Sequence, residues 1–239
     1  MHDLAPLIEH TALKADTTPA AIDRLIATAR THGFAGVCLP GGYVRRARTL
    51  LDADKDTTTR LVTVAGFPLG NGGIAIKADE AALAIREGAD HVDMVADVGC
   101  LIAAREAASN AEATRLMDHV EADIHRVRQA MQAAARGRPV ELKVILETAC
   151  LDYRGIVDAV KRARNAGADW VKTSTGFGPG GASLAAVAAM QDALRDGPRL
   201  KIKAAGGIKT LSQMTAYADM DVDAIGCSGA AEAFAERAA

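Results

Sequence analysis

The sequence predicts an α/β protein folded as a single (β/α)8 TIM barrel domain over residues 1–239. Eight short apolar or β-branched runs alternate with amphipathic stretches, at a spacing of roughly 25 to 30 residues, the length of one βα unit. Such alternation implies a parallel sheet covered by helices, and eight units in 239 residues match the size of a closed barrel. An open, doubly wound sheet is the structural alternative.

The predicted strands share short length and β-branched or apolar composition. They are LIEHTAL (7–13), FAGVCL (34–39), RLVTVAGF (60–67), HVDMVAD (91–97), ELKVILET (141–148), DWVKTST (169–175), LKIKAAG (200–206) and DAIGCSG (223–229). The predicted helices include KADEAALAIREGA (77–89) and YRGIVDAVKRARNAGA (153–168). The first helix has defined end signals, with Thr18 as N-cap, Pro19 at the first helical position and Gly33 as the stop.

The connection over residues 98–139 is longer than the others. Its composition predicts a long or broken helix, with SNAEAT (109–114) as the turn. His119, Asp123 and His125 lie in it, but a solvated helix face explains this spacing better than a metal site, so no metal ligands are predicted. No linker rich in Pro, Gly or Ser divides the chain, which favours one domain.

The composition excludes several classes of function. A formal net charge of −2 and 3% aromatic residues give no case for nucleic-acid binding. Cys38, Cys100, Cys150 and Cys227 form no C-x-x-C pair, which favours free thiols in a reducing compartment over a disulfide framework or a zinc site. The start, MHDLAPLIEH, lacks the pattern of a secretory signal, and no run approaches the ~18 apolar residues of a membrane span. We therefore expect a cytoplasmic protein without a membrane partner.

Two segments of the chain resemble each other. GADHVDMV (88–95) and GADWVKTS (167–174) superpose without a gap and place Asp93 on Lys172. If each Gly-Ala-Asp turn leads into a strand, the two charged side chains lie at the same depth and on the same face. Ionisable groups in apolar strands are costly to bury, so they are usually paired or functional.

Further lysines lie on neighbouring strands: Lys143 on the fifth, and Lys201 and Lys203 on the seventh. Strand alternation puts Lys201 and Lys203 on one face, and Lys203 is nearer the carboxyl end, where barrel enzymes place their chemistry. A structural ion pair would explain any one lysine by itself. Three lysines and Asp93 on consecutive strands instead favour a shared cavity with a catalytic role.

Crowded lysines have a chemical use. A lysine with an ordinary pKa is protonated at neutral pH and is not a nucleophile, whereas desolvation and a neighbouring ammonium both stabilise the neutral amine. A neutral lysine attacks a carbonyl to give an iminium ion, which accepts electrons when the adjacent C–C bond breaks. A carboxylate such as Asp93 can move the protons, directly or through a water.

Two glycine clusters predict the kind of substrate. Gly206-Gly207 ends the seventh strand, and 226–229 (GCSG) ends the eighth. Loops after these strands often hold a phosphate in barrel enzymes, because glycine lets backbone N–H groups approach it. The Gly176-x-Gly178-x-x-Gly181 pattern formally matches a dinucleotide fingerprint, but it follows the sixth strand and contains Pro179, which argues against a nucleotide.

Several motifs resemble the deoxyribose-phosphate aldolase family. The most specific are VKTSTGFGPGGA (171–182) and KAAGGIKT (203–210). IEHTALKADTT, VAGFPLGNGGIAIKADEA, HVDMVADVG and LKVILET are similar to other units of that family in the same order, so the resemblance covers essentially the whole chain.

This resemblance implies a cofactor-free class I aldolase that reversibly cleaves 2-deoxy-D-ribose 5-phosphate to acetaldehyde and D-glyceraldehyde 3-phosphate. Lys172 would form the Schiff base, Lys203 would be the second lysine that assists proton transfer, and Asp93 would donate and accept protons. Lys143 would contact Asp93. The remaining substrate-binding residues would be Thr175, Gly176, Gly206, Gly207, Ser228 and Gly229. The family is cytoplasmic and usually dimeric, sometimes tetrameric.

The chain departs from the family pattern at three places. Asp97 stands where an asparagine is usual, CLPGGYV (38–44) lacks a common polar residue, and the connection after Gly99 is longer by roughly ten residues, within the loop variation that barrels tolerate. Asp97 raises the alternative of a Schiff-base aldolase with a different short aldehyde or sugar acceptor. A non-catalytic sugar-phosphate-binding barrel is the second alternative.

Overall fold

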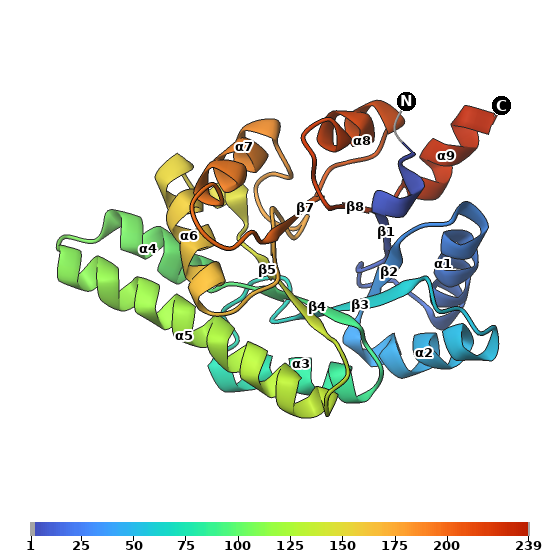
Figure 1. Cartoon of the computed structure of the whole chain (residues 1–239), viewed down its shortest axis with the longest axis horizontal. Helices are drawn as coiled ribbons and strands as arrows, with labels where there is room; N and C mark the ends of the chain where they lie inside the picture. The colour runs from blue at the N-terminus through green and yellow to red at the C-terminus, as the bar shows by residue number, and fades with distance from the viewer. Residues whose placement is uncertain (1–2, 239) are drawn as a thin grey trace.

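The computed structural model describes residues 3–238 and contains a closed barrel of eight parallel strands in the order β1 to β8. Figure 1 shows the strands surrounded by helices. The predicted TIM barrel is confirmed, and the open sheet is excluded because β1 pairs with β8. Met1, His2 and Ala239, which belong to the predicted domain, lie outside the described residues.

The eight predicted strands are all present, but each is shorter than expected. Their bounds are β1 Ile8–Thr11, β2 Gly36–Leu39, β3 Arg60–Ala65, β4 His91–Val95, β5 Glu141–Ile145, β6 Trp170–Lys172, β7 Lys201–Ala205 and β8 Ala224–Cys227. The trimmed residues lie mostly at the carboxyl ends, where the chain leaves the hydrogen-bonded ladder to form loops. Apolar composition continues past those ends, so it overestimates strand length.

Helices follow the strands around the barrel. They are α1 Pro19–His32, α2 Val44–Ala53, α3 Ile74–Arg86, α4 Val98–Glu106, α5 Asn110–Ala135, α6 Tyr153–Asn165, α7 Leu184–Ala193, α8 Leu211–Ala218 and α9 Ala230–Ala238, with 3-10 turns at Ala5–Leu7, Gly41–Tyr43 and Thr148–Cys150. The predicted ends of α1 are confirmed: the Thr18 hydroxyl accepts from the backbone N–H of Ala21, and Gly33 has a left-handed φ of 67°. Among residues 3–238, no helix has the length and apolarity needed to cross a membrane.

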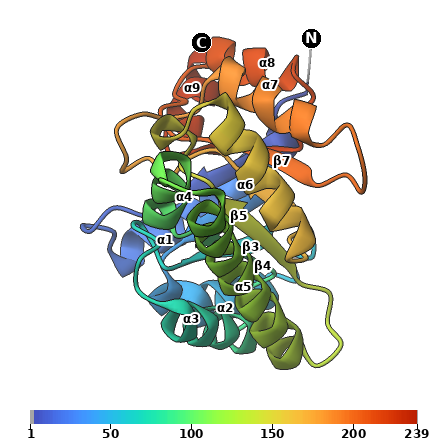
Figure 2. The same ribbon diagram turned by 90° about the vertical axis from the view of Figure 1, so that its left-hand side faces the viewer.

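The long fourth connection is a broken helix. Helices α4 and α5 lie side by side (Figures 1 and 2), and Ser109 caps the second of them by accepting from the N–H of Glu112. The predicted turn at 109–114 is therefore wrong by a few residues, since SNAEAT contains the cap and first turn of α5. Serine followed by a glutamate three residues later is itself a helix-start signal.

One residue of this connection contradicts the sequence prediction of a solvated face. His119 and His125 are exposed, but Asp123 is fully buried and its Oδ2 pairs with Lys77 Nζ. Lys77, on α3, also donates to the carbonyls of Gly70 at 2.7 Å and Val95 at 3.2 Å. Asp123 follows Val120 by three residues, so it lies on the apolar face of α5, and that spacing was the signal that it is buried.

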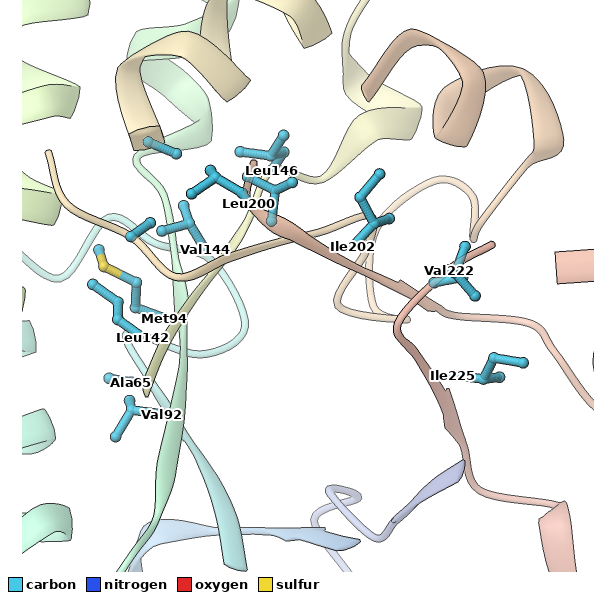
Figure 3. Close-up of a cluster of buried hydrophobic side chains, with 14 of the residues drawn as sticks. Ala65, Val92, Met94, Leu142, Val144, Leu146, Leu200, Ile202, Val222 and Ile225 are labelled. Carbon is cyan, nitrogen blue, oxygen red and sulfur yellow. The ribbon is translucent and has the colours of Figure 1, made fainter. Parts of the chain in front are cut away.

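The hydrophobic core lies between the outer face of the barrel and the helices. Figure 3 shows Val92 and Met94 of β4 beside Leu142 and Val144 of β5 in this layer. Side chains alternate along a strand, so the intervening Asp93 and Lys143 point the other way, into the barrel. The apolar packing that closes the barrel thus also directs the charged residues inward.

The strand register places the inward side chains in layers. When the paired residues are followed once around the barrel, the path returns to β1 about eight residues from its starting point. Residues at equal depth in the barrel are therefore offset from the paired residue by about one position on each successive strand. The upper layer, nearer the carboxyl ends, comes from the even strands and the lower layer from the odd strands. The upper layer contains Cys38, Asp93, Lys172 and Gly226; the lower layer contains Glu9, Val62, Lys143 and Lys203.

Candidate active site

The two layers bring three lysines and two carboxylates into contact at the centre of the barrel. Asp93 Oδ2 accepts from Lys172 Nζ at 2.8 Å and from Lys203 Nζ at 2.7 Å. Lys143 Nζ lies 3.3 Å from Asp93 Oδ1. The structure therefore places the three lysines predicted on consecutive strands around the carboxylate of Asp93. The two segments that resemble each other put Asp93 and Lys172 in the same layer.

Glu9 is the member that sequence reasoning missed. Its Oε1 lies 2.8 Å from Lys143 Nζ, and its Oε2 accepts from Lys203 Nζ. It is a buried carboxylate within a predicted strand, the same kind of signal that identified Asp93. Charge balance was a second signal, because three buried lysines need more than one carboxylate.

The lysines hold both carboxylates in the ionised form. Burial by itself raises the pKa of Glu9, but the charges of Lys143 and Lys203 outweigh it and lower the pKa to about 2. Burial likewise acts to raise the pKa of Asp93, and Lys143, Lys172 and Lys203 together hold it well below its usual value. The centre of the barrel thus carries two negative charges throughout the physiological pH range.

Lys203 is held in the charged form. Burial acts to lower its pKa, but the facing carboxylates of Asp93 and Glu9 raise it well above that of an ordinary lysine. Its side chain is fully buried. Lys203 is therefore suited to act as a fixed positive charge beside Asp93 and not as a nucleophile.

Lys172 differs from the other two lysines in position and in contacts. It lies in the upper layer and retains 3% exposure, whereas Lys143 and Lys203 have none. Each of those two faces both Glu9 and Asp93, but Lys172 contacts Asp93 alone among the described residues. With all three lysines protonated, three positive and two negative charges leave +1 at the centre.

Lys201 shares the face of Lys203 but does not belong to this cluster. It lies at the start of β7, where its Nζ pairs with Glu141 Oε1 at 2.8 Å and stands 4.8 Å from the centroid of the Trp170 ring. It is exposed at the amino-terminal end of the barrel. Strand alternation alone could not separate the two lysines, because the depth of each depends on where the strand enters the barrel.

The loop after Lys172 is held by a second missed residue, Glu147. Its Oε2 accepts from the hydroxyl of Thr175 and from the Thr175 N–H at 3.3 Å, while Oε1 is buried without a hydrogen-bond partner among the described residues. Glu147 has a φ of 52°, a left-handed conformation that is unfavourable for a glutamate. A Cβ on Gly178 would stand 2.8 Å from the Glu147 carboxyl carbon, which explains the need for glycine there.

The predicted glycines bring two loops into close contact. A Cβ on Gly181 would lie 2.2 Å from the carbonyl oxygen of Gly206, and that oxygen accepts from Ala182 N–H at 3.0 Å. Gly176, Gly206 and Gly207 have φ values of 87°, 92° and 76°. The Gly176–Gly181 pattern therefore serves backbone packing against the β7 loop.

Ser228 and Gly229 lie immediately before α9, in the loop that follows β8. The Cys227 thiol donates to the Ile208 carbonyl at 3.0 Å and ties this loop to the one that contains Gly207. Gly207 and Ser228 are exposed. The structure thus places the last predicted substrate-binding residues in two neighbouring loops at the carboxyl end of the barrel, beside the amino terminus of a helix.

Residues 6–234 match the family described as DeoC/LacD family aldolase. The chain belongs to this family. It is 37% identical over 226 residues to the deoxyribose-phosphate aldolase of Thermoanaerobacter sp. (strain X514), covering 95% of this chain and 93% of that protein. Deoxyribose-phosphate aldolase 1 of Oceanobacillus iheyensis is 40% identical over 226 residues, with the same shares of 95% and 93%.

The fold is shared with the deoxyribose phosphate aldolase of Aeropyrum pernix, with a TM-score of 0.83, 24% identity and coverage of 99% of this chain and 92% of that one. The chain is therefore an enzyme of the lyase class.

Asp97, the first departure of this aldolase from the family pattern, has its contacts outside the barrel. Its Oδ1 caps α4 by accepting from Cys100 N–H at 3.1 Å, and its Oδ2 lies 3.6 Å from His119 Nε2. These partners belong to α4 and α5. These contacts give no direct support to the different acceptor that Asp97 suggested from the sequence.

The second departure, residues 38–44, begins inside the aldolase barrel. Cys38 is buried in the upper layer, and burial raises the pKa of its thiol. The segment then turns through the 3-10 turn at Gly41–Tyr43, where the Tyr43 hydroxyl donates to the Thr17 carbonyl at 3.0 Å. The Tyr43–Thr17 hydrogen bond ties the loop after β2 to the segment that precedes α1.

Proposed function

We propose that this aldolase reversibly cleaves 2-deoxy-D-ribose 5-phosphate to acetaldehyde and D-glyceraldehyde 3-phosphate through a Schiff base on Lys172. The curated relatives at 37% and 40% identity carry the name of this reaction. The observation that carries the proposal is the asymmetry among the three buried lysines. Lys172 lies in the upper layer, retains 3% exposure and, among the described residues, pairs with one carboxylate only, so it is the lysine best placed to meet a carbonyl that enters from the carboxyl end of the barrel.

The proposed reaction begins when the neutral Lys172 amine attacks the C1 aldehyde of the open-chain sugar. Loss of water gives an iminium ion, and removal of the proton from the C3 hydroxyl then breaks the C2–C3 bond. The bonding electrons move into the iminium to give an enamine, and D-glyceraldehyde 3-phosphate leaves. Protonation of the enamine at C2 and hydrolysis release acetaldehyde and restore the lysine.

Asp93 is the proposed proton carrier. Its Oδ2 is occupied by Lys172 and Lys203, whereas its Oδ1 accepts no hydrogen bond from the described residues. Oδ1, which faces Lys143 Nζ at 3.3 Å, is the oxygen that would exchange a proton with a water or a substrate hydroxyl. Lys203 and Lys143 keep Asp93 anionic between proton transfers, and the iminium itself supplies the electron sink, so the proposed chemistry requires no metal or organic cofactor.

The proposed phosphate site lies at the loops after β6, β7 and β8. Backbone groups at Gly176, Gly206, Gly207, Ser228 and Gly229 would hold the phosphate, with Thr175 fixed by Glu147 at the edge of the site. Helix α9 begins directly after Gly229, and a helix amino terminus favours an anion. The glycines allow close approach of the backbone to the phosphate.

Borohydride trapping tests the proposal. Reduction in the presence of deoxyribose 5-phosphate should leave a covalent adduct on the peptide that contains Lys172, detected by intact mass and peptide mapping. A folded, ligand-bound protein without an adduct would favour the sugar-phosphate-binding alternative. If free deoxyribose gave as much adduct and as high a turnover as deoxyribose 5-phosphate, the alternative of an aldolase with a different acceptor would be favoured.

Self-association and a cytoplasmic location accompany this proposal. A homodimer or homotetramer is supported by three exposed apolar side chains near one another in sequence, Leu69, Ile76 and Leu83. Ile76 and Leu83 are seven residues apart on α3 and share a face of that helix. Light scattering of the purified protein would give the mass, and a monomer at micromolar concentration would contradict the oligomer.

A further inference from the structure

A cluster of three potential metal ligands lies outside the barrel, between the end of β4, α4 and α5. Asp97, Cys100 and His119 each offer one donor atom, and these atoms all lie within 4.8 Å of one another. Asp97 and Cys100 are half-buried and His119 is exposed. The cluster is separate from the residues proposed to act on the sugar.

The donor types match a particular class of cation. Thiolate, imidazole and carboxylate together are the ligands of zinc and of chemically similar divalent ions, whereas magnesium and calcium take oxygen ligands. Ligand bonds of about 2.0–2.3 Å in a tetrahedral site set donor atoms roughly 3.3–3.7 Å apart. The 3.6 Å between Asp97 Oδ2 and His119 Nε2 already has this separation, and it is too long for a hydrogen bond.

One carboxylate oxygen of Asp123, buried beside the cluster, accepts no hydrogen bond from the described residues. Asp123 is one helical turn after His119 on α5, and its side chain is 1% exposed. Lys77 satisfies Oδ2, but Oδ1 accepts no hydrogen bond among the described residues. An unsatisfied buried carboxylate oxygen is costly, and a cation or its bound water would remove that cost.

The helix cap at α4 does not use up the donors of Asp97. Only Oδ1 accepts the backbone N–H of Cys100, at 3.1 Å, which leaves Oδ2 directed toward His119. Asparagine would cap a helix equally well. The extra negative charge of Asp97 is therefore unnecessary for the cap and calls for a different explanation.

We propose that Asp97, Cys100 and His119 form a binding site for a zinc-like divalent cation, with a water as the fourth ligand. Cys100 binds as the thiolate, so metal binding releases the thiol proton to solvent and weakens on acidification. The site links the start of α4 to α5 across the lengthened connection. Neither the proposed aldolase reaction nor the family pattern requires this site, and its test is independent of activity.

Cobalt(II) provides the test, because it takes zinc sites and absorbs light. The chelator-treated full-length protein is titrated with Co2+, and the thiolate-to-cobalt charge-transfer band and the visible bands are recorded. We expect stoichiometric binding with a charge-transfer band that Zn2+ abolishes by displacement. Cys100→Ser should remove the band. Asp97→Asn and His119→Ala should each weaken Co2+ binding at least about tenfold, because even residues that only hydrogen-bond to metal ligands change metal affinity by that much when mutated.

Matched variants control for other sites and for folding. Cys150→Ser and His125→Ala change a half-exposed thiol and an exposed histidine outside the cluster, and both should bind Co2+ as the unaltered protein does. Asp97→Asn retains a side chain that caps α4, so the circular dichroism of this variant should match that of the unaltered protein. A folded, unaltered protein without the charge-transfer band, or a band that persists in Cys100→Ser, would overturn the proposal.

Discussion

Two buried groups of charges in this protein differ in how completely they are paired. Between α3 and α5, Lys77 and Asp123 form a one-to-one pair, and Lys77 Nζ has three acceptors in Asp123, Gly70 and Val95. At the centre of the barrel, three lysines face two carboxylates, and Lys172 has a single acceptor among the described residues.

The difference fits a structural role for Lys77 and the chemical role proposed for Lys172. An ammonium with three acceptors has its positive charge and all its protons satisfied, so it holds the surrounding segments together. An ammonium with a single acceptor, nearer the carboxyl end of the barrel, has fewer contacts to give up, which fits the reactive role proposed for Lys172. Burial of a lysine is therefore less informative about function than the balance of charge around it.

The largest expected effect is on the incompletely paired lysine. Lys172→Met should lower aldolase turnover by about 10⁴-fold or more, because it removes the proposed nucleophile. It should leave the midpoint of urea unfolding unchanged or raise it, since the variant removes the excess positive charge. Steady-state cleavage of deoxyribose 5-phosphate and urea denaturation measure the two effects, and normal turnover would rule out the Schiff base on Lys172.

The fully paired lysine should behave in the opposite way. Lys77→Met should lower the free energy of unfolding by about 3–5 kcal/mol, because it leaves Asp123 buried without its counter-charge. Urea denaturation measures the loss, and the double variant Lys77→Met/Asp123→Leu should recover much of it. Equal destabilisation of the single and double variants would show that the pair itself is not the source of the stability.

The same contrast can be tested at Glu147, a buried carboxylate with one satisfied oxygen. Gly178→Ala places a methyl group against this carboxylate, and the resulting shift of the Thr175 loop should lower kcat/KM by up to about 10²-fold. Gly42→Ala is the matched control, since a Cβ there meets nothing within 4 Å. Equal kinetics for the two variants would show that the contact between Glu147 and Gly178 does not position the loop.

The smallest effect concerns the pH dependence of stability. The pKa of Glu9 is lowered from 4.5 to about 2 in the folded protein by Lys143 and Lys203, despite its burial. Its stabilising contribution is thus fully present above pH 4.5 and is lost as the pH falls toward 2, where the unfolded chain binds the proton more readily. Glu9→Gln should flatten the stability curve in this window, as followed by thermal unfolding. An unchanged slope in the variant would contradict the assignment to Glu9.

The sequence was sufficient for much of the architecture and of the site. Repetition of apolar runs and helical stretches predicted eight βα units, because each unit must bury one face of its helix against its strand. Thr18, Pro19 and Gly33 predicted the ends of α1 from local hydrogen-bonding needs alone. The superposition of Asp93 on Lys172 predicted that both lie at the same depth and on the same face of their strands, since strand alternation is a local property.

Other features depended on the tertiary structure. The stagger of the strands decides that Lys203 reaches Asp93 while Lys201 stays at the far end, and no local pattern contains that stagger. Glu9 joins the cluster only because β1 closes against β8, more than 190 residues away in the chain. Asp97, Cys100 and His119 come together only because α4 folds back along α5. Local sequence determines which way a side chain points, but closure of the barrel and packing of its helices determine which charges it meets.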